Sequence, residues 1–103
     1  MSRLISDETW ATLTIWMEAR GESFAGQCAV AEVIQTRMRR RYTSDGTVPG
    51  TVLWPFQFSC WNTDDRQRLR AAMLDEADAQ LVMCRTAWRD VLAGRSVVPG
   101  AVL

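Results

Sequence analysis

The chain has 103 residues, of which 48% are apolar, so it is long enough for one small domain with a hydrophobic core. Its 12 basic and 12 acidic side chains cancel, which excludes a net field that would attract nucleic acid or an anionic membrane. The chain has no histidine and no C-x-x-C pair, so a zinc site would lack ligands, and we expect neither a metal nor a cofactor.

Residues 1–8 lack the apolar stretch of about 7–15 residues that a secretory signal needs. No later run approaches the ~18 apolar residues of a membrane span. We therefore expect synthesis in the cytoplasm without a signal peptide and no membrane insertion. Three cysteines, Cys28, Cys60 and Cys84, are odd in number and far apart, a pattern that favours reduced, buried thiols.

A first helix is predicted from a cap at Ser6 or Asp7 to a stop at Gly21. Its apolar stripe contains residues at helical spacing, namely Trp10, Leu13 and Met17. Glu18 lies one turn beyond Ile15, at the margin of this stripe. A helix that ends at glycine leaves its last side chains at an edge, where a carboxylate can face a cleft. Glu18 is therefore the first candidate for a catalytic acid.

A second helix is predicted over residues 25–40, capped by Ser23, and we expect it to be the central core helix. Its buried face is predicted to contain Val30, Val33, Ile34 and Met38. Residues 42–50 are rich in turn formers and predict a loop. Pro55 forbids a regular central strand, so residues 51–61 are expected to form an extended, irregular segment.

Helical sequence then runs from caps at residues 62–65 to Ala93, with an interruption near residues 74–76 and a stop at Gly94. The residues spaced to pack are Leu81, Cys84 or Arg85, Trp88 and Leu92. The run D-E-A-D at residues 75–78 matches a helicase motif only by its letters, because no P-loop accompanies it. We expect these acids to begin the last helix, where negative charge suits the helix dipole. The chain as a whole is predicted to be mainly α, with three to four helices.

Other residues leave alternatives open. The arginines between residues 37 and 41 could contact phosphate, but a cationic last turn suits any helix C-terminus, so we expect a solvated helix end. Trp54 and Trp61 are equally consistent with packing in the fold and with forming a surface on which a sugar ring stacks. Glu32 interrupts an apolar run and is expected to point to solvent.

Two motifs resemble one family. Residues 18–34, E-A-R-G-E-S-F-A-G-Q-C-A-V-A-E-V-I, are similar to the motif E-A-R-G-E-x-x-x-G-Q-x-A-V-A-x-V-I of the SleB/CwlJ-type cell wall hydrolases. Residues 57–62, Q-F-S-C-W-N, resemble the family's Q-F-S motif in the form of its phage and proteobacterial members. The resemblance covers roughly residues 10–94 and implies a lysozyme-like or lytic-transglycosylase-like domain that cuts the glycan strands of peptidoglycan.

The resemblance also implies roles for individual residues. Glu18 corresponds to the single catalytic acid. Substrate contacts are expected from Glu22, Gln57, Ser59 and Trp61, with Trp61 as the stacking surface. Structural support is expected from Arg20, Gly21, Gly26, Gln27 and Arg37.

A single acid favours a lytic transglycosylase. Retaining glycosidases place a second carboxylate about 5–5.5 Å away, and inverting ones about 6.5–9.5 Å away. In the transglycosylase reaction the sugar's own C6 hydroxyl closes a 1,6-anhydro ring, so no second carboxylate is required. The acid must stay protonated near neutral pH, for which we expect Glu18 to be buried beside Trp and Ile side chains. A touching cation would oppose this, so Arg20 is expected to buttress the turn or pair with Glu22.

Three other functions remain open: a hydrolytic muramidase using Glu18 with Glu22 or Glu32, a silent glycan-binding or assembly module, and a DNA-binding protein using the arginines at 37–41. Family members continue through a D-P-T-x-G-A segment, whereas this chain keeps only P-G-A at residues 99–101. We therefore expect residues 1–103 to form a single catalytic domain that is incomplete at its C-terminus. A phage or prophage enzyme delivered to the wall by a holin or the virion is expected, and the oligomeric state is left open.

Overall fold

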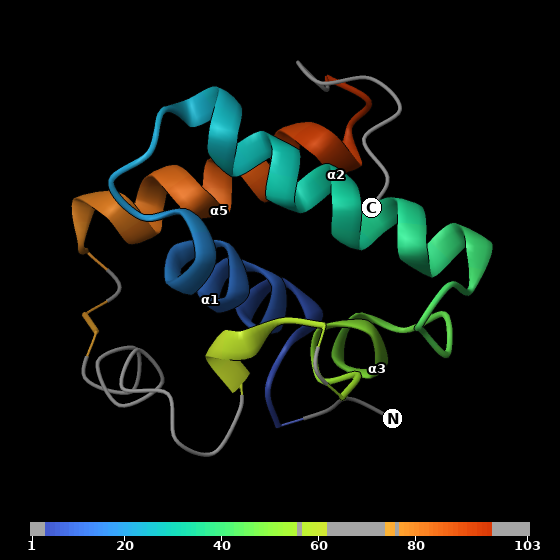
Figure 1. Ribbon diagram of the computed structural model, residues 1–103. Helices are drawn as coiled ribbons and strands as arrows, with labels where there is room; N and C mark the ends of the chain where they lie inside the picture. Colours follow the sequence, from blue (N-terminus) through green and yellow to red (C-terminus); the bar gives the residue numbers. More distant parts are fainter. Residues whose placement is uncertain (1–3, 56, 62–73, 76, 96–103) are drawn as a thin grey trace.

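The computed structural model of the protein describes residues 4–55, 57–61, 74–75 and 77–95. Within these residues it contains four α-helices, one 3-10 turn and no strand, which confirms the predicted mainly α fold. The elements in chain order are α1 (Asp7–Ala19), α2 (Phe24–Arg40), α3 (Val48–Val52), η1 (Ser59–Trp61) and α5 (Ala79–Leu92) (Figure 1). The helical sequence predicted at residues 62–73 lies outside the described residues.

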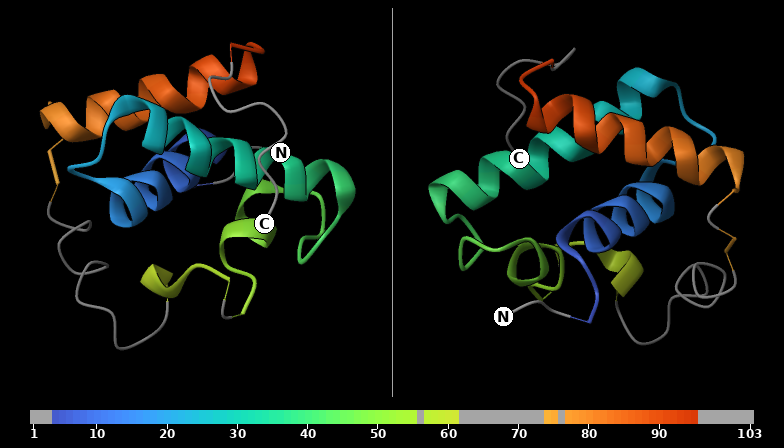
Figure 2. Two further views of the ribbon diagram at one scale, coloured as in Figure 1. Left: turned by 45° about the horizontal axis from the view of Figure 1, so that its top comes forward. Right: turned by 180° about the vertical axis from the view of Figure 1, so that it is seen from behind.

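Helix α1 begins and ends as predicted but occupies an unexpected place. The Ser6 Oγ accepts a hydrogen bond from the backbone N–H of Thr9 at 3.1 Å, and Gly21 turns the chain with a φ of 81°. Figures 1 and 2 show α1 between the α2 and α5 pair on one side and α3 with η1 on the other, and it contacts all four. The prediction that residues 25–40 form the central helix is therefore wrong, because α1 is the element covered from both sides.

Helix α2 starts at its predicted cap, where the Ser23 Oγ accepts from the backbone N–H of Gly26 at 3.2 Å. Its fully buried face consists of Gln27, Cys28, Ala31 and Ile34. Of the predicted buried face, Ile34 is buried as expected, whereas Val30, Val33 and Met38 are half-buried and pack against the core. The helix is thus rotated from the predicted orientation, since its packing against α1 and α5 uses the 27/28/31/34 side.

Two charged residues of α2 are buried, contrary to expectation. Arg37 is 6% exposed, and its guanidinium carbon lies 5.3 Å from the centroid of the Phe58 ring, so it is not part of a solvated helix end. Glu32 is 8% exposed and does not point to solvent. It lies close enough to Cys28 for its charge to act on that thiol. The Arg37 guanidinium lies over Phe58, which is distant in sequence, and local periodicity does not reveal such a contact.

Helix α3 replaces the end of the predicted loop and the start of the predicted extended segment. Its cap is Thr47, whose Oγ1 accepts from the backbone N–H of Gly50 at 3.0 Å, and Pro49 stands in its first turn. A cap followed closely by proline is a helix-start signal that outweighed the turn composition of residues 42–50. Beyond α3 a turn closes with the backbone N–H of Gln57 donating to the Trp54 carbonyl at 3.2 Å.

Helix α5 is capped by Asp78, whose Oδ1 accepts from the backbone N–H of Leu81 at 3.0 Å, and Gly94 follows its end with a φ of 80°. The expectation that the acids at 75–78 begin the last helix is confirmed at Asp78. Leu81, Cys84 and Trp88 are buried as predicted, together with Ala87 and Val91. Leu92, expected to pack, is 58% exposed, because the buried stripe runs through Val91 instead.

The three cysteines are buried thiols outside any disulfide, as predicted. Burial raises the pKa of Cys84 to about 12, and the charge of Asp78 adds to this effect. Burial also raises the pKa of Cys28, with further contributions from Asp90 and Glu32. None of the described helices is both long enough and apolar enough to cross a membrane.

Candidate active site

Glu18 emerges from the buried side of the central helix. The residues one and two turns before it on the same face, Thr14, Ile15 and Ala11, have no exposed surface. Within residues 11–19, Glu18 is exposed, Leu13 is half-buried and every other residue is buried. The expected burial of Glu18 beside Trp and Ile is therefore not found. A carboxylate that continues a core stripe and yet meets water marks an opening in the core.

That opening is a cleft of about 220 Å³. It is lined by Glu18 of α1, by Val30, Val33 and Arg37 of α2, and by Gln57 and Phe58 ahead of η1. The tertiary fold thus brings Glu18 together with Gln57 and Arg37, three of the residues singled out by the sequence. Apolar walls with a few convergent polar groups are typical of a ligand site.

The polar groups of the cleft differ in chemistry. Among the described residues that line it, Glu18 is the one carboxylate and Arg37 the one cation. The Arg37 guanidinium stacks on Phe58, which fixes both side chains at the cleft wall. The Gln57 amide can both donate and accept hydrogen bonds. The cleft can therefore hold a neutral, hydroxylated substrate against apolar walls and present one proton-transferring group to it.

Arg20 stays away from the candidate acid. Its guanidinium carbon lies 4.5 Å from the centroid of the Trp16 ring, and its backbone N–H donates to the Trp16 carbonyl at 3.0 Å. Among the described residues Arg20 forms no ion pair with Glu18 or with Glu22. Arg20 thus packs on α1 and supports the turn, and the expected alternative, a pair with Glu22, is not formed.

A residue that sequence reasoning missed braces the turn after Glu18. The Gln80 Oε1 on α5 accepts from the backbone N–H of Gly21 and from the Gln27 Nε2, both at 3.2 Å. Gln27 is fully buried, and its Nε2 also lies 3.4 Å from the Ala19 carbonyl. The end of α1 is therefore tied to both α2 and α5. Gln80 carries no motif and is remote in sequence, so no sequence signal could have found it.

Glu22 lies outside the cleft lining. A Cβ atom added at Gly26 would lie 3.3 Å from the Glu22 Cβ and 3.6 Å from its Oε2, so this side chain lies over the first turn of α2. Gly26 leaves room for it there, and the carboxylate suits the positive end of the helix dipole. Glu32 is two residues along α2 from Val30 and therefore points to the far side of the helix from the cleft.

Trp61 is placed in packing and not in the cleft lining. It is half-buried, stands edge-on to Trp10 with ring centroids 5.2 Å apart, and donates from its Nε1 to the Thr14 Oγ1 at 2.9 Å. Ser59 begins η1, and its side chain lies outside the described part of the structure. Trp54, the other tryptophan of this segment, is 41% exposed.

The family model described as Cell Wall Hydrolase matches residues 21–103, which is well over half of the chain. The chain belongs to the cell wall hydrolase family. This confirms the resemblance and shows a role in peptidoglycan degradation in general. The match includes Gln27, Arg37 and Gln57 of this cell wall hydrolase and starts three residues after Glu18. Searches of curated proteins and of solved structures found no match.

Proposed function

We propose that this cell wall hydrolase is a lytic transglycosylase that cleaves the β-1,4 bond between N-acetylmuramic acid and N-acetylglucosamine. The observation that carries the proposal is the position of Glu18, an exposed carboxylate at the end of an otherwise buried helix face. Glu18 lines a cleft in which no other described lining residue carries a carboxylate. A reaction that needs one acid fits this lining better than one that needs two.

Glu18 acts first as acid and then as base. Its carboxyl proton passes to the glycosidic oxygen while the bond from that oxygen to C1 of the muramic acid breaks. The released N-acetylglucosamine keeps this proton on its O4 hydroxyl. The Glu18 carboxylate then takes the proton of the C6 hydroxyl, and O6 bonds to C1 to close the 1,6-anhydro ring. Glu18 ends protonated as it began, and no water is consumed.

The remaining lining residues bind and orient the strand. Gln57 can hydrogen-bond an acetamido group or a sugar hydroxyl next to the scissile bond. Val30, Val33 and Phe58 form apolar walls that limit the water around the developing charge. Arg37 holds Phe58 in position through its stacked guanidinium.

A hydrolytic muramidase is the second candidate, and it would require another carboxylate near Glu18. Glu22 lies over Gly26 and Glu32 points to the far side of α2, so neither lines the cleft. This candidate and a silent glycan-binding module therefore stand as outcomes of the test.

The test is mass spectrometry of the muropeptides released from purified peptidoglycan by the unmodified chain, Glu18→Gln and Glu22→Gln. We expect anhydromuramyl products from the unmodified chain and from Glu22→Gln. Loss of the acid in Glu18→Gln should lower the rate by about 10³-fold, as for other general acids. Products with reducing ends would identify a muramidase, and the absence of products from all three chains would indicate a binding module.

A further inference from the structure

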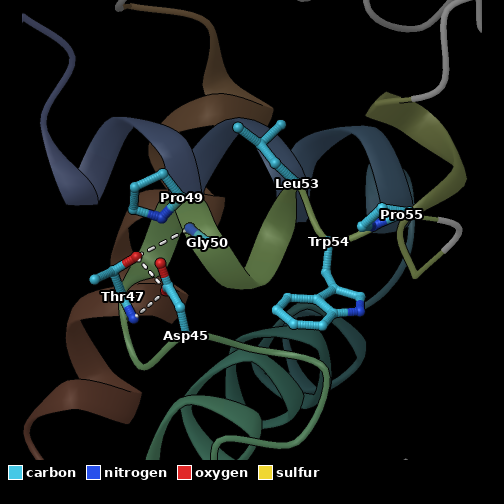
Figure 3. A pocket seen from close by; sticks show the side chains of 7 residues that line it. All are labelled: Asp45, Thr47, Pro49, Gly50, Leu53, Trp54 and Pro55. Atoms are coloured by element: carbon cyan, nitrogen blue, oxygen red, sulfur yellow. Dashed lines mark hydrogen bonds between the residues drawn. The ribbon is translucent and has the colours of Figure 1, made fainter.

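A second and larger hollow lies beside α3, and the proposed reaction does not use it. Its volume is about 510 Å³, within the range of about 300–1,000 Å³ usual for ligand sites. Its lining includes Asp45, Thr47, Pro49, Leu53, Trp54 and Pro55 (Figure 3). The hollow is apolar except at one edge.

The apolar part presents an uncovered indole. Trp54 is 41% exposed and its neighbour Leu53 is 44% exposed, although most large apolar side chains of the described residues are buried or half-buried. The Trp61 ring, in contrast, packs edge-on against Trp10, and its Nε1 donates a hydrogen bond to Thr14. A flat indole face with prolines beside it is a surface on which the C–H face of a pyranose ring can stack.

The polar edge carries a fixed carboxylate. The Asp45 Oδ1 accepts from the backbone N–H of Thr47 at 2.9 Å and from its Oγ1 at 2.6 Å. A Cβ atom at residue 50 would lie 1.9 Å from this oxygen, so Gly50 is what allows the carboxylate to lie against α3. Figure 3 shows Asp45 and Thr47 across from the Trp54 indole. Among the described residues that line the hollow, Asp45 is the one that is charged, which favours a neutral hydroxyl-bearing ligand over an anion.

The hollow and the candidate active site are lined by neighbouring residues of the chain. Trp54 and Pro55 line the hollow, whereas Gln57 and Phe58 line the Glu18 cleft. The turn between these pairs is closed by the hydrogen bond from the Gln57 backbone N–H to the Trp54 carbonyl. A glycan strand that ran on from the cleft past Gln57 and followed this turn would reach the Trp54 surface.

We propose that this hollow is an accessory saccharide subsite, in which a sugar ring of the bound glycan strand stacks on Trp54 and donates a hydroxyl hydrogen bond to Asp45. Its occupant is a further residue of the strand that Glu18 cleaves, so the inference rests on the proposed function. The subsite adds affinity for long strands and takes no part in bond cleavage.

Binding is tested in the Glu18→Gln chain, which holds the strand without turnover. Isothermal titration with purified β-1,4-linked glycan strands of peptidoglycan should show that Trp54→Ala weakens binding by about tenfold, the effect of losing one stacked ring. Trp54→Phe keeps a ring and should lose about threefold. Gly50→Ala, which displaces the Asp45 carboxylate without changing charge, should also weaken binding. Tyr42→Ala removes an aromatic residue that is more exposed than Trp54, at 58%, and lies outside the linings of both cavities, so it should change nothing.

The outcomes separate the subsite from the reaction. If Trp54→Ala weakens binding but the unmodified chain releases no anhydromuramyl product, the subsite stands and the proposed reaction fails. If these products form and Trp54→Ala binds like its parent, the subsite is overturned and the reaction stands. Equal losses in Trp54→Ala and Tyr42→Ala, or no binding by the parent, would also overturn the subsite.

Discussion

Glu18 stands out among the acidic residues because of its surroundings and not its own chemistry. It continues the face of α1 on which Thr14 and Ile15 are fully buried, and it is exposed where that face meets the cleft. Glu22 and Glu32, which belong to the same sequence motif, lie respectively over Gly26 and on the far side of α2. Glu18 is thus distinguished from the other acidic residues because the fold places its side chain at the opening of the cleft.

The buried thiols make stability depend on pH in the alkaline range. The pKa of Cys84 is raised from 9.0 to about 12, so above pH 9 the unfolded chain releases a proton that the folded chain retains. The contribution to stability is therefore complete below about pH 9 and is lost as the pH rises toward 12. We expect the free energy of unfolding to fall by up to about 1.4 kcal/mol per pH unit for this thiol.

The measurement is urea unfolding between pH 8 and 10.5 for the unmodified chain and Cys84→Val, which keeps an apolar side chain at the site. In the variant, the free energy of unfolding should fall less steeply with pH in the alkaline range. The remaining dependence should be the part due to Cys28, whose pKa is also raised by burial. An identical slope in both chains would show that Cys84 does not titrate in this way.

At the scale of elements, the turn between α1 and α2 decides where Glu18 points. Gly21 takes a φ of 81° and donates to Gln80, which also receives the Gln27 amide. The Gln80 Oε1 of α5 therefore joins the turn after α1 to α2. Gln80 is absent from the cleft lining and can affect catalysis only through the position of α1.

Gln80→Leu should lower kcat by about ten- to a hundredfold with little change in KM, because small displacements of a catalytic group are costly while the binding walls remain. Gln80→Glu retains an acceptor oxygen in the same shape and should keep most of the activity. Steady-state kinetics on soluble glycan strands measures both. Equal losses in the two variants, or a loss confined to KM, would rule out the positioning role.

At the scale of the whole molecule, the outer face of α5 is clamped to the start of α1. Arg89 donates from Nε and Nη2 to the two carboxylate oxygens of Glu8, each at 2.8 Å, and Arg85 lies 3.8 Å from the same group. The hydrogen bond from Arg89 lowers the pKa of Glu8 against the opposing effect of burial, with help from the charges of both arginines. The clamp joins the two ends of the described chain.

A lowered pKa on Glu8 means that the clamp stabilises the fold above about pH 4.5 and that this contribution is lost as the pH falls further. Glu8→Gln should therefore unfold more easily at pH 6 and show less additional loss below pH 4.5. The difference from the unmodified chain should shrink in high salt, because the pair is partly exposed. Thermal unfolding against pH measures this, with Glu22→Gln, which has no ion pair among the described residues, as control. A salt-independent difference would contradict the assignment.

The sequence by itself determined where α1 and α2 begin, where α1 and α5 end, the mainly α class, the buried thiols outside any disulfide and the choice of Glu18 as the candidate acid, but not α3. Caps such as Ser6 and Ser23 act on backbone groups within one turn, and glycine stops act at a single residue, so these features are local. Only the tertiary structure decided that α1 is central, that Arg37 is covered by Phe58, and that Gln57 reaches the Glu18 cleft. It also decided that Trp61 is packed while Trp54 is uncovered. Whether a side chain is buried or lines the cleft depends on contacts between residues far apart in the chain. Helical periodicity predicts which residues share a face of a helix, but not which other helix packs against that face.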